Sequence, residues 1–248
     1  MRFKGRIAVV LGGNSGIGLA SAIEFAREGA QVVITGRNPV TLAAAAEEIG
    51  AGTLALQSDI SDLSALDIAM ARIAEAHGRI DVLFVNAGIG AFAPLEEVTE
   101  AYWDTMLDTN LKGPFFAVQK AVPLMGAGGA VVLTASLGHV KGIAGNSVYA
   151  AAKAGLRALA RNLGAELVGR GIRVNSFSPG PIDTPLFSRS GIPESDMPGF
   201  RAFIEGAVPM KRFGTPQEAA RAVLFLASDD ASFITGIDMF VDGGAASF

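Results

Sequence analysis

The chain has 248 residues, of which 50% are hydrophobic and 18% are charged, and its formal net charge at pH 7 is −4. It has no cysteine and only two histidines, which excludes disulfides and a Cys/His zinc site, and its carboxylates form no clustered metal-binding motif. Basic residues are scattered rather than gathered in a stripe, so we expect no nucleic-acid partner.

The amino terminus leads directly into a short apolar run that ends in glycines, which predicts a strand and a turn and is too short for a signal peptide. No apolar run approaches the ~20 residues of a membrane span. We therefore expect a cytoplasmic protein that does not bind membranes.

Short runs rich in β-branched residues alternate with long segments of helical period, the pattern of βαβ units around a buried parallel sheet. The predicted strands cover residues 7–11, 31–35, 53–57, 82–85, 130–134, 173–177 and 239–241. The predicted helices cover residues 17–28, 40–49, 63–77, 102–124, 147–168 and 216–227. No linker rich in Pro, Gly or Ser divides the chain. We predict a single doubly wound α/β domain over residues 1–248, with a seven-stranded, mainly parallel sheet and helices on both faces.

One long stretch, residues 181–211, is predicted to be irregular, because it is rich in Pro, Gly and Ser with interspersed Phe, Leu and Met. Segments of this length inside a compact domain are usually lids or binding segments. We predict a substrate lid from about residue 185 to residue 211.

A glycine-rich turn follows the first predicted strand. Its glycines, Gly12, Gly16 and Gly18, let the backbone approach a pyrophosphate, while the amino terminus of the next helix supplies free N–H groups. The spacing differs from G-x-G-x-x-G, and the Lys-Ser/Thr of a P-loop is missing. A plain structural turn is the alternative, but the position at the first βα turn of a parallel sheet favours a dinucleotide.

The end of the second predicted strand indicates which dinucleotide binds. A carboxylate here would bind the adenosine ribose of NAD, but the chain has Gly36 at this position and Arg37 after it. A guanidinium can pair with a 2′-phosphate. We therefore predict that NADP(H) is preferred over NAD(H), the alternative being that Arg37 is an ordinary surface residue.

Tyr149 and Lys153 stand four residues apart on a predicted helix and so share a face, and Ser136 follows a predicted strand. A cation near a phenol favours the phenolate, so Tyr149 could act as acid or base near neutral pH. Taken alone, the same spacing also describes a half-buried aromatic residue beside a solvated lysine.

Several motifs follow one another in a fixed order over about 170 residues: Gly12-x-x-x-Gly16-x-Gly18, Asn86-Ala87-Gly88, Asn110, Ser136, Tyr149-x-x-x-Lys153 and Pro179-Gly180. In this set and order the chain resembles the classical short-chain dehydrogenases/reductases over essentially its whole length. The resemblance implies a Rossmann-type fold and an oxidoreductase that uses a nicotinamide dinucleotide.

The resemblance also implies a catalytic tetrad. Tyr149 would be the acid/base, and Lys153 would lower its pKa and bind the nicotinamide ribose. Ser136 would polarise the substrate carbonyl, and Asn110 would hold a water that links Lys153 to bulk solvent. From its sequence context alone, Asn110 could equally bond backbone within an interrupted helix. Hydride would reach carbon as Tyr149 protonates the oxygen and Ser136 stabilises the developing charge.

For the cofactor, the resemblance implies that residues 86–88 border adenine and ribose, that Asp59 meets adenine, and that Ile182 and Thr184 reach the carboxamide. The chain departs from the family at Leu11, where threonine is usual, and at Ala152, where serine is frequent, and neither change removes a tetrad member. With Tyr149 and Lys153, the complete predicted set is Gly12, Asn14, Ser15, Gly16, Ile17, Gly18, Arg37, Asn38, Asp59, Ile60, Asn86, Ala87, Gly88, Pro179, Gly180, Ile182 and Thr184.

The substrate pocket should form from loops at the carboxyl ends of the strands, at residues 89–94 and 137–142, together with the lid. Its predicted substrate residues are Ser136, Tyr149, Phe92, His139, Val140 and Leu186, with Phe187, Met197, Phe200 and Phe203 adding apolar surface. These side chains favour a hydrophobic or aromatic ketone over a sugar. Two alternatives are that several phenylalanines only pack the lid on the body and that His139 is an exposed loop residue.

We therefore predict an NADP-dependent carbonyl reductase or alcohol dehydrogenase that acts on a small-molecule carbonyl or alcohol. One alternative is a 3-oxoacyl-thioester reductase, whose acyl carrier would need basic residues near the pocket mouth; the candidates are Lys141, Arg189, Lys211 and Arg212. Another alternative is a catalytically silent NADP-sensing regulator. The carboxyl end, residues 241–248, resembles the tetramer-forming tail of the family, so we expect a homotetramer.

Overall fold

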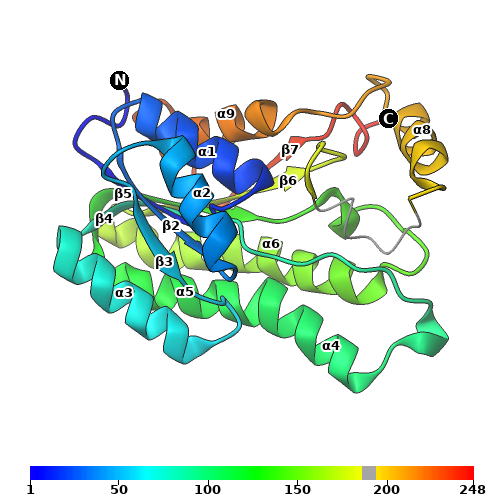
Figure 1. The fold of residues 1–248 in the computed structure, drawn as a ribbon, viewed down its shortest axis with the longest axis horizontal. Helices are drawn as coiled ribbons and strands as arrows, with labels where there is room; N and C mark the ends of the chain where they lie inside the picture. The colour runs from blue at the N-terminus through cyan, green and yellow to red at the C-terminus, as the bar shows by residue number, and fades with distance from the viewer. Residues whose placement is uncertain (186–193) are drawn as a thin grey trace.

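The computed structural model describes residues 1–185 and 194–248. Its centre is a parallel sheet with the strand order β3-β2-β1-β4-β5-β6-β7 (Figure 1). The strands are β1 Ile7–Leu11, β2 Gln31–Gly36, β3 Leu54–Gln57, β4 Ile80–Val85, β5 Met125–Thr134, β6 Arg173–Pro179 and β7 Asp238–Val241. The order reverses between β1 and β4, which is the switch point of a doubly wound sheet. The predicted fold class and all seven predicted strands are confirmed, with shifts at the strand ends.

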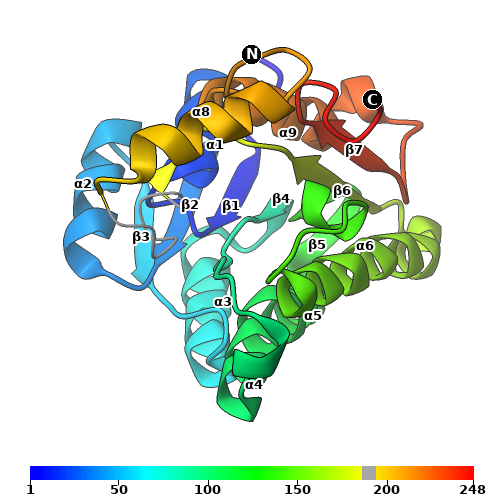
Figure 2. The ribbon, with the colours of Figure 1, turned by 90° about the vertical axis from the view of Figure 1, so that its right-hand side faces the viewer.

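Helices cover both faces of the sheet, as the view along the strands shows (Figure 2). One face carries α1 Gly16–Arg27, α2 Pro39–Ile49 and α9 Pro216–Ala227; the other carries α3 Leu63–His77, α5 Gly113–Ala121 and α6 Ser147–Leu167. Successive residues of a strand point to opposite faces, so β1 contributes Val9 to the core beneath α3, α5 and α6, and Val10 to the core beneath α1, α2 and α9. Both faces are buried, which explains the continuous apolar strands of the sequence.

The helix predicted for residues 102–124 is not continuous. It consists of α4 Glu100–Leu107, a π-helical turn Asp108–Lys112, α5, and a 3₁₀ turn Val122–Leu124. The wider turn brings Gly113 against the loop after β3, where a Cβ atom would lie only 2.4 Å from the carbonyl oxygen of Ile60. A regular helix with a larger residue would not fit there.

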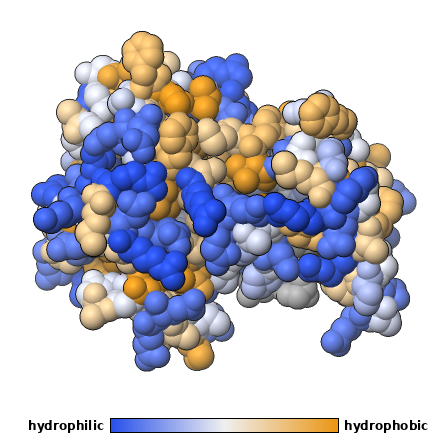
Figure 3. Space-filling view, turned by 90° about the horizontal axis from the view of Figure 1, so that it is seen from above, coloured by the Kyte–Doolittle hydropathy of each residue, from blue (hydrophilic) through white to orange (hydrophobic). Residues whose placement is uncertain are grey.

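The prediction that residues 181–211 are irregular is wrong for Met197–Ala207, which forms helix α8. Its Pro198, Gly199 and Gly206 hid this helix, although proline is well tolerated in a first helical turn. Seen from the side of α1, α8 and α9, both hydrophilic and apolar side chains reach the surface (Figure 3). Among the described residues, no helix is both long enough and apolar enough to span a membrane.

Candidate active site

The glycine turn after β1 packs so closely that it requires glycine. At Gly12, where φ is +79°, a Cβ atom would lie 2.7 Å from the Cα atom of Ala87. The turn is tied to its neighbours by Asn86 Nδ2, which donates to the Gly12 carbonyl oxygen over 3.1 Å, and by Thr35 Oγ1, which accepts from Gly12 N over 3.3 Å. The Thr35 hydroxyl thus bonds to the turn, which the side chain of Leu11 cannot do.

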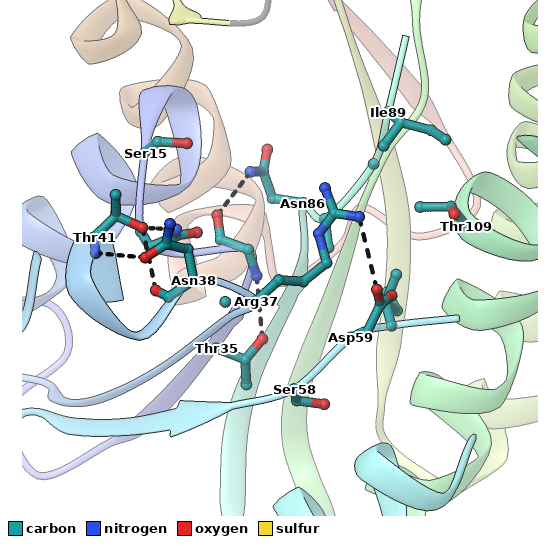
Figure 4. A pocket seen from close by; sticks show the side chains of 16 residues that line it. Ser15, Thr35, Arg37, Asn38, Thr41, Ser58, Asp59, Asn86, Ile89 and Thr109 are labelled. Atoms are coloured by element: carbon teal, nitrogen blue, oxygen red, sulfur yellow. Dashed lines mark hydrogen bonds and ion pairs between the residues drawn. The ribbon is translucent and has the colours of Figure 1, made fainter. Parts of the chain in front are cut away.

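One groove runs from this turn across the ends of β2 and β3 (Figure 4). Arg37 crosses it and pairs with Asp59, with 3.7 Å between Nη1 and Oδ2. Burial alone would raise the pKa of Asp59, but hydrogen bonds from Ser61 and the charge of Arg37 outweigh burial and lower this pKa. The groove is lined by Gly12, Asn14, Ser15, Thr35, Gly36, Arg37, Asn38, Thr41, Ser58, Asp59, Ile60, Asn86, Ala87, Gly88, Ile89 and Thr109.

Asn38 and Ser58 both line this groove, but only Asn38 has a hydrogen-bonding role within the fold. Asn38 caps α2, because its Oδ1 accepts from Val40 N over 2.9 Å and from Thr41 N over 3.3 Å. Ser58, which the sequence analysis missed, has a buried hydroxyl without a partner among the described residues. An orphaned hydroxyl in a groove beside a glycine cradle fits a polar ligand such as an adenosine, so the residues present suit a dinucleotide.

The second groove continues towards α6 and brings together three of the four predicted catalytic residues, Asn110, Tyr149 and Lys153, while Ser136 lines an apolar pocket beside it. The second groove is lined by Ser15, Gly16, Ile17, Asn86, Gly88, Ile89, Asn110, Thr134, Ala135, Tyr149, Lys153, Pro179, Thr184 and Pro185. Thr184 packs on the glycine turn, since a Cβ atom at Gly16 would lie 3.3 Å from the Thr184 Cβ atom. Gly18 and Gly180 do not line this groove but allow close backbone packing. A Cβ atom at Gly18 would lie 2.0 Å from Gly12 O, and one at Gly180 would lie 2.6 Å from Asp242 Cα.

Lys153 is almost completely buried, and its Nζ donates to the Thr134 carbonyl oxygen over 2.8 Å. Burial lowers the pKa of this ammonium from 10.5 to about 8. Its Nζ lies 5.6 Å from the centre of the Tyr149 ring. Near neutral pH this lysine is therefore a cation close to losing its proton.

Tyr149 and Ser136 both line the apolar pocket, and the Ser136 hydroxyl is close enough to act on the pKa of the Tyr149 phenol. Burial raises the pKa of the Tyr149 phenol, and the nearby Ser136 hydroxyl opposes that rise without cancelling it. The predicted lowering of the phenol pKa is therefore wrong for this structure, because the lost hydration of the phenolate dominates and Lys153 donates to Thr134. Ser136 Oγ also accepts from Gly138 N over 3.0 Å, which fixes the loop after β5.

Asn110 lies in the π-helical turn and is completely buried. Its Nδ2 donates to Met106 O over 3.1 Å, and its Oδ1 accepts from Ile89 N over 3.2 Å. Gly88 separates it from Lys153: a Cβ atom there would lie 2.8 Å from Asn110 Oδ1 and 3.4 Å from Lys153 Nζ. Asn110 thus bonds backbone beside the lysine, and the water relay stays a prediction.

An apolar pocket opens on the other side of Ser136 and Tyr149. Three residues that were not predicted for this pocket also line it: Ile143, Asn146 and, from helix α8, Ile204. The full lining is Ile17, Gly90, Ala91, Phe92, Ser136, Leu137, Gly138, Ile143, Asn146, Tyr149, Pro179, Gly180, Pro181, Ile182, Thr184, Phe200 and Ile204. Phe92 and Phe200 are thus placed as predicted for an apolar wall.

Several residues predicted for this pocket lie elsewhere. Val140 is exposed, Phe203 on α8 is 74% exposed, and Met197 is absent from the lining. They miss the pocket because the loop and helix turn these side chains away from it. Leu186, Phe187 and Arg189 lie outside the described residues.

His139 also points away from the pocket, which corrects its predicted role. Its ring stacks on Phe240 with centroids 5.7 Å apart, its Nδ1 contacts the Ser136 carbonyl oxygen, and its Nε2 lies 3.3 Å from Asp238 Oδ2. Asp238 also accepts from Ser178 Oγ over 2.9 Å. Asp238 is buried on the edge strand β7, and the His139 ring is oriented towards its carboxylate instead of towards the pocket.

Comparisons with known proteins agree with this geometry. A family model described as enoyl-(acyl carrier protein) reductase matches residues 12–246. The chain is 36% identical to the 3-oxoacyl-acyl-carrier-protein reductase FabG of Thermotoga maritima, covering 98% of this chain and 99% of that protein. It is 37% identical to a levodione reductase of Leifsonia aquatica, covering 99% and 96%. A crystal structure of levodione reductase superposes with a TM-score of 0.95 at 36% identity, covering 100% of both chains.

The chain therefore belongs to the short-chain dehydrogenase/reductase family, whose members are oxidoreductases that use NAD(H) or NADP(H). The relatives include both reductases of small carbonyl compounds and reductases of acyl-carrier thioesters by name. The family is thus established.

Proposed function

We propose that this protein interconverts a ketone or aldehyde and an alcohol by hydride transfer, as an NADP(H)-preferring carbonyl reductase or alcohol dehydrogenase for hydrophobic or aromatic substrates. One observation carries the proposal: Ser136 and Tyr149 lie next to each other in the apolar pocket, at the point where Tyr149 also lines the second groove. A carbonyl group in the pocket would meet two hydroxyl donors there.

A bound nicotinamide would supply a hydride in reduction and accept one in oxidation. Residues 12–18, 86–88 and 179–184, with Arg37, Asn38, Asp59 and Lys153, would hold the dinucleotide. As the carbonyl oxygen gains negative charge, Ser136 Oγ donates a hydrogen bond and Tyr149 gives up its phenolic proton. In the opposite direction the Tyr149 phenolate takes the proton of the alcohol.

The test is turnover of a ketone panel by the wild type and by Tyr149→Phe. We expect the variant to lose at least 100-fold in kcat, because general acid catalysis contributes about 10²–10⁴-fold. Binding of NADPH, followed by its fluorescence, should stay within about twofold. A variant that keeps its kcat would refute the role of Tyr149, and a wild type that binds NADPH but turns over no ketone would instead indicate a silent sensor.

The preference for NADP(H) is supported by the groove at β2. A side chain at Gly36 would collide with Asn14, because a Cβ atom would lie 2.7 Å from the Asn14 Cγ atom. A side chain at this position would therefore require Asn14 to move, and the guanidinium of Arg37 lies across the groove with a 3.7 Å ion pair to Asp59. A 2′-phosphate would be a stronger partner for that guanidinium.

Arg37→Ala tests the preference. A charged hydrogen bond contributes about 1.5–3 kcal/mol, so the ratio of kcat/KM for NADPH to that for NADH should fall roughly 10- to 100-fold. Arg72→Ala is the matched control, since Arg72 is exposed on α3 and pairs with Glu75. An unchanged ratio in Arg37→Ala would show that the 2′-phosphate is bound elsewhere.

A second candidate is a 3-oxoacyl-thioester reductase, favoured by the 36% identity to such an enzyme. An acyl carrier would need free basic residues near the pocket. Arg212 instead pairs with Glu218 over 2.6 Å, and Lys211 donates to Gly206 O over 2.6 Å. Comparing kcat/KM for acetoacetyl-CoA and for cyclohexanone separates the two candidates.

We further propose a homotetramer, from the resemblance of the tail. Apolar side chains near the carboxyl end, Phe233 and Phe248, are more than nine-tenths exposed and would be covered in such an assembly. Analytical ultracentrifugation of the full chain measures the state directly.

A further inference from the structure

Asn146 carries a side-chain amide that the proposed reaction does not use. It lies directly before α6, three residues ahead of Tyr149, and lines the apolar pocket. Only 6% of the residue is exposed, and its side chain makes no hydrogen bond to any residue in the described part of the chain. The amide is not among the fully enclosed unpaired polar atoms of the described residues, so it is open to the pocket, where a ligand group can pair with it.

Helix capping does not explain this asparagine. At an N-cap position, an asparagine side chain ordinarily accepts from the backbone N–H groups of the first turn. Here the backbone of Asn146 is satisfied, since its N donates to Ile143 O over 3.1 Å and its O accepts from Ala150 N over 2.8 Å. The side chain makes no cap bond and instead lines the pocket.

The amide shares a small space with the hydroxyls that would hold the reacting carbonyl. A Cβ atom at Gly138 would lie 2.9 Å from Asn146 Nδ2, 3.4 Å from Ser136 Oγ and 3.6 Å from Tyr149 Cε1. Gly138 therefore leaves room for these three side chains to converge. The neighbouring wall, with Phe92, is apolar.

We propose that Asn146 determines substrate specificity by binding a second oxygen, which the substrate bears one or two carbons away from the reacting carbon. This inference rests on the proposed carbonyl–alcohol activity. The amide can donate from Nδ2 and accept at Oδ1, so it pairs with either a carbonyl or a hydroxyl group. Asn146 Nδ2 and Ser136 Oγ both lie within 3.4 Å of one point, the position of a Cβ atom at Gly138, so that second oxygen would lie close to the first. The substrate class is thus a vicinal or 1,3-dioxygenated compound whose remaining surface is apolar.

The experiment compares cyclohexanone, 2-hydroxycyclohexanone and cyclohexane-1,4-dione as substrates of the wild type, Asn146→Leu and Asn162→Leu. Asn162 is the matched control because it lies on the same helix, is exposed, and donates only to Ala158 O. In Asn146→Leu, the ratio of kcat/KM for 2-hydroxycyclohexanone to that for cyclohexanone should fall roughly tenfold, the effect of one neutral hydrogen bond. Intrinsic reactivity cancels in this comparison.

In cyclohexane-1,4-dione the second oxygen lies across the ring. The ratio of kcat/KM for this dione to that for cyclohexanone should therefore change less than threefold in Asn146→Leu. Asn162→Leu should change neither of the two ratios. An equal loss on all three compounds would overturn the inference, because it would mean that Asn146 only orders Ser136. An unchanged ratio for 2-hydroxycyclohexanone would overturn it as well.

A binding measurement keeps the inference testable if Asn146→Leu does not fold or if the proposed activity itself fails. Calorimetry of the wild type saturated with NADPH compares trans-cyclohexane-1,2-diol with cyclohexanol, neither of which can be reduced. Tighter binding of the diol by about fivefold or more supports recognition of the second oxygen, and equal binding overturns it. Failure of the proposed function would appear separately, as absent turnover of every ketone by the wild type.

Discussion

Replacing Lys153 by methionine should abolish activity and yet stabilise the folded protein. The lysine is 4% exposed, and burial lowers its pKa from 10.5 to about 8. Below pH 8 the ammonium is charged in both the folded and the unfolded chain, so the full cost of its burial opposes folding. The cost fades as the pH rises from 8 to 10.5, because the folded chain has already lost the proton while the unfolded chain still binds it.

The magnitude follows from the same pKa. A lowering from 10.5 to about 8, at about 1.4 kcal/mol per pKa unit, costs about 3 kcal/mol at pH 7. Methionine removes this cost but also the bond from Nζ to Thr134 O, which is worth about 1 kcal/mol. The net gain of about 2 kcal/mol corresponds to a Tm increase of roughly 4–8 °C for a chain of this size.

The assay is urea unfolding without added dinucleotide at pH 7 and at pH 10, at matched protein concentration. The stability difference between Lys153→Met and wild type should be largest at pH 7 and should shrink or reverse at pH 10. Lys112→Met is the control, because Lys112 is half exposed and pairs with Asp108 on the surface. If Lys153→Met is less stable than wild type at pH 7, or if the difference does not depend on pH, the reasoning about burial is refuted.

Two further predictions concern the frame of the site. Gly12→Ala should weaken NADPH binding at least tenfold and lower Tm, because its Cβ atom would lie 2.7 Å from Ala87 Cα at a φ of +79°; unchanged fluorescence titrations with NADPH would contradict this. His139→Leu should lower kcat roughly tenfold with little effect on the Kd for NADPH, because His139 bridges the Ser136 carbonyl oxygen to Asp238. An unchanged kcat would show that Ser136 is held by its own loop.

The sheet could be predicted because central strands such as β1 and β4 are short apolar runs, and burial on both faces makes such runs continuous. Helix α8 could not, since its Pro198 and Gly199 match a loop as well as a first helical turn. The residues of the tetrad could be placed together from their order along the chain. The direction of the Tyr149 pKa could not, because burial, which the spacing does not show, raises this pKa.

His139 and Asn146 show the same limit at the level of single side chains. Both lie near Ser136 in sequence, and only the fold decides which one faces the substrate: Asp238, about 100 residues later, draws the imidazole away from the pocket. No local pattern relates these two positions. Asn146 resembles an ordinary helix cap in the sequence, and only the missing cap bond reveals that its amide is free.

Two polar groups that weaken the fold lie where ligands would bind. The buried charge of Lys153 and the orphaned hydroxyl of Ser58 are both at the carboxyl edge of the sheet. Ser21 and His77 also have an unpaired buried atom, and nothing in the structure explains them. Each group at the edge costs folding free energy that packing of the two cores must offset. Because a ligand that pairs with such groups binds only the folded chain, it stabilises that chain through the same contacts that give it affinity.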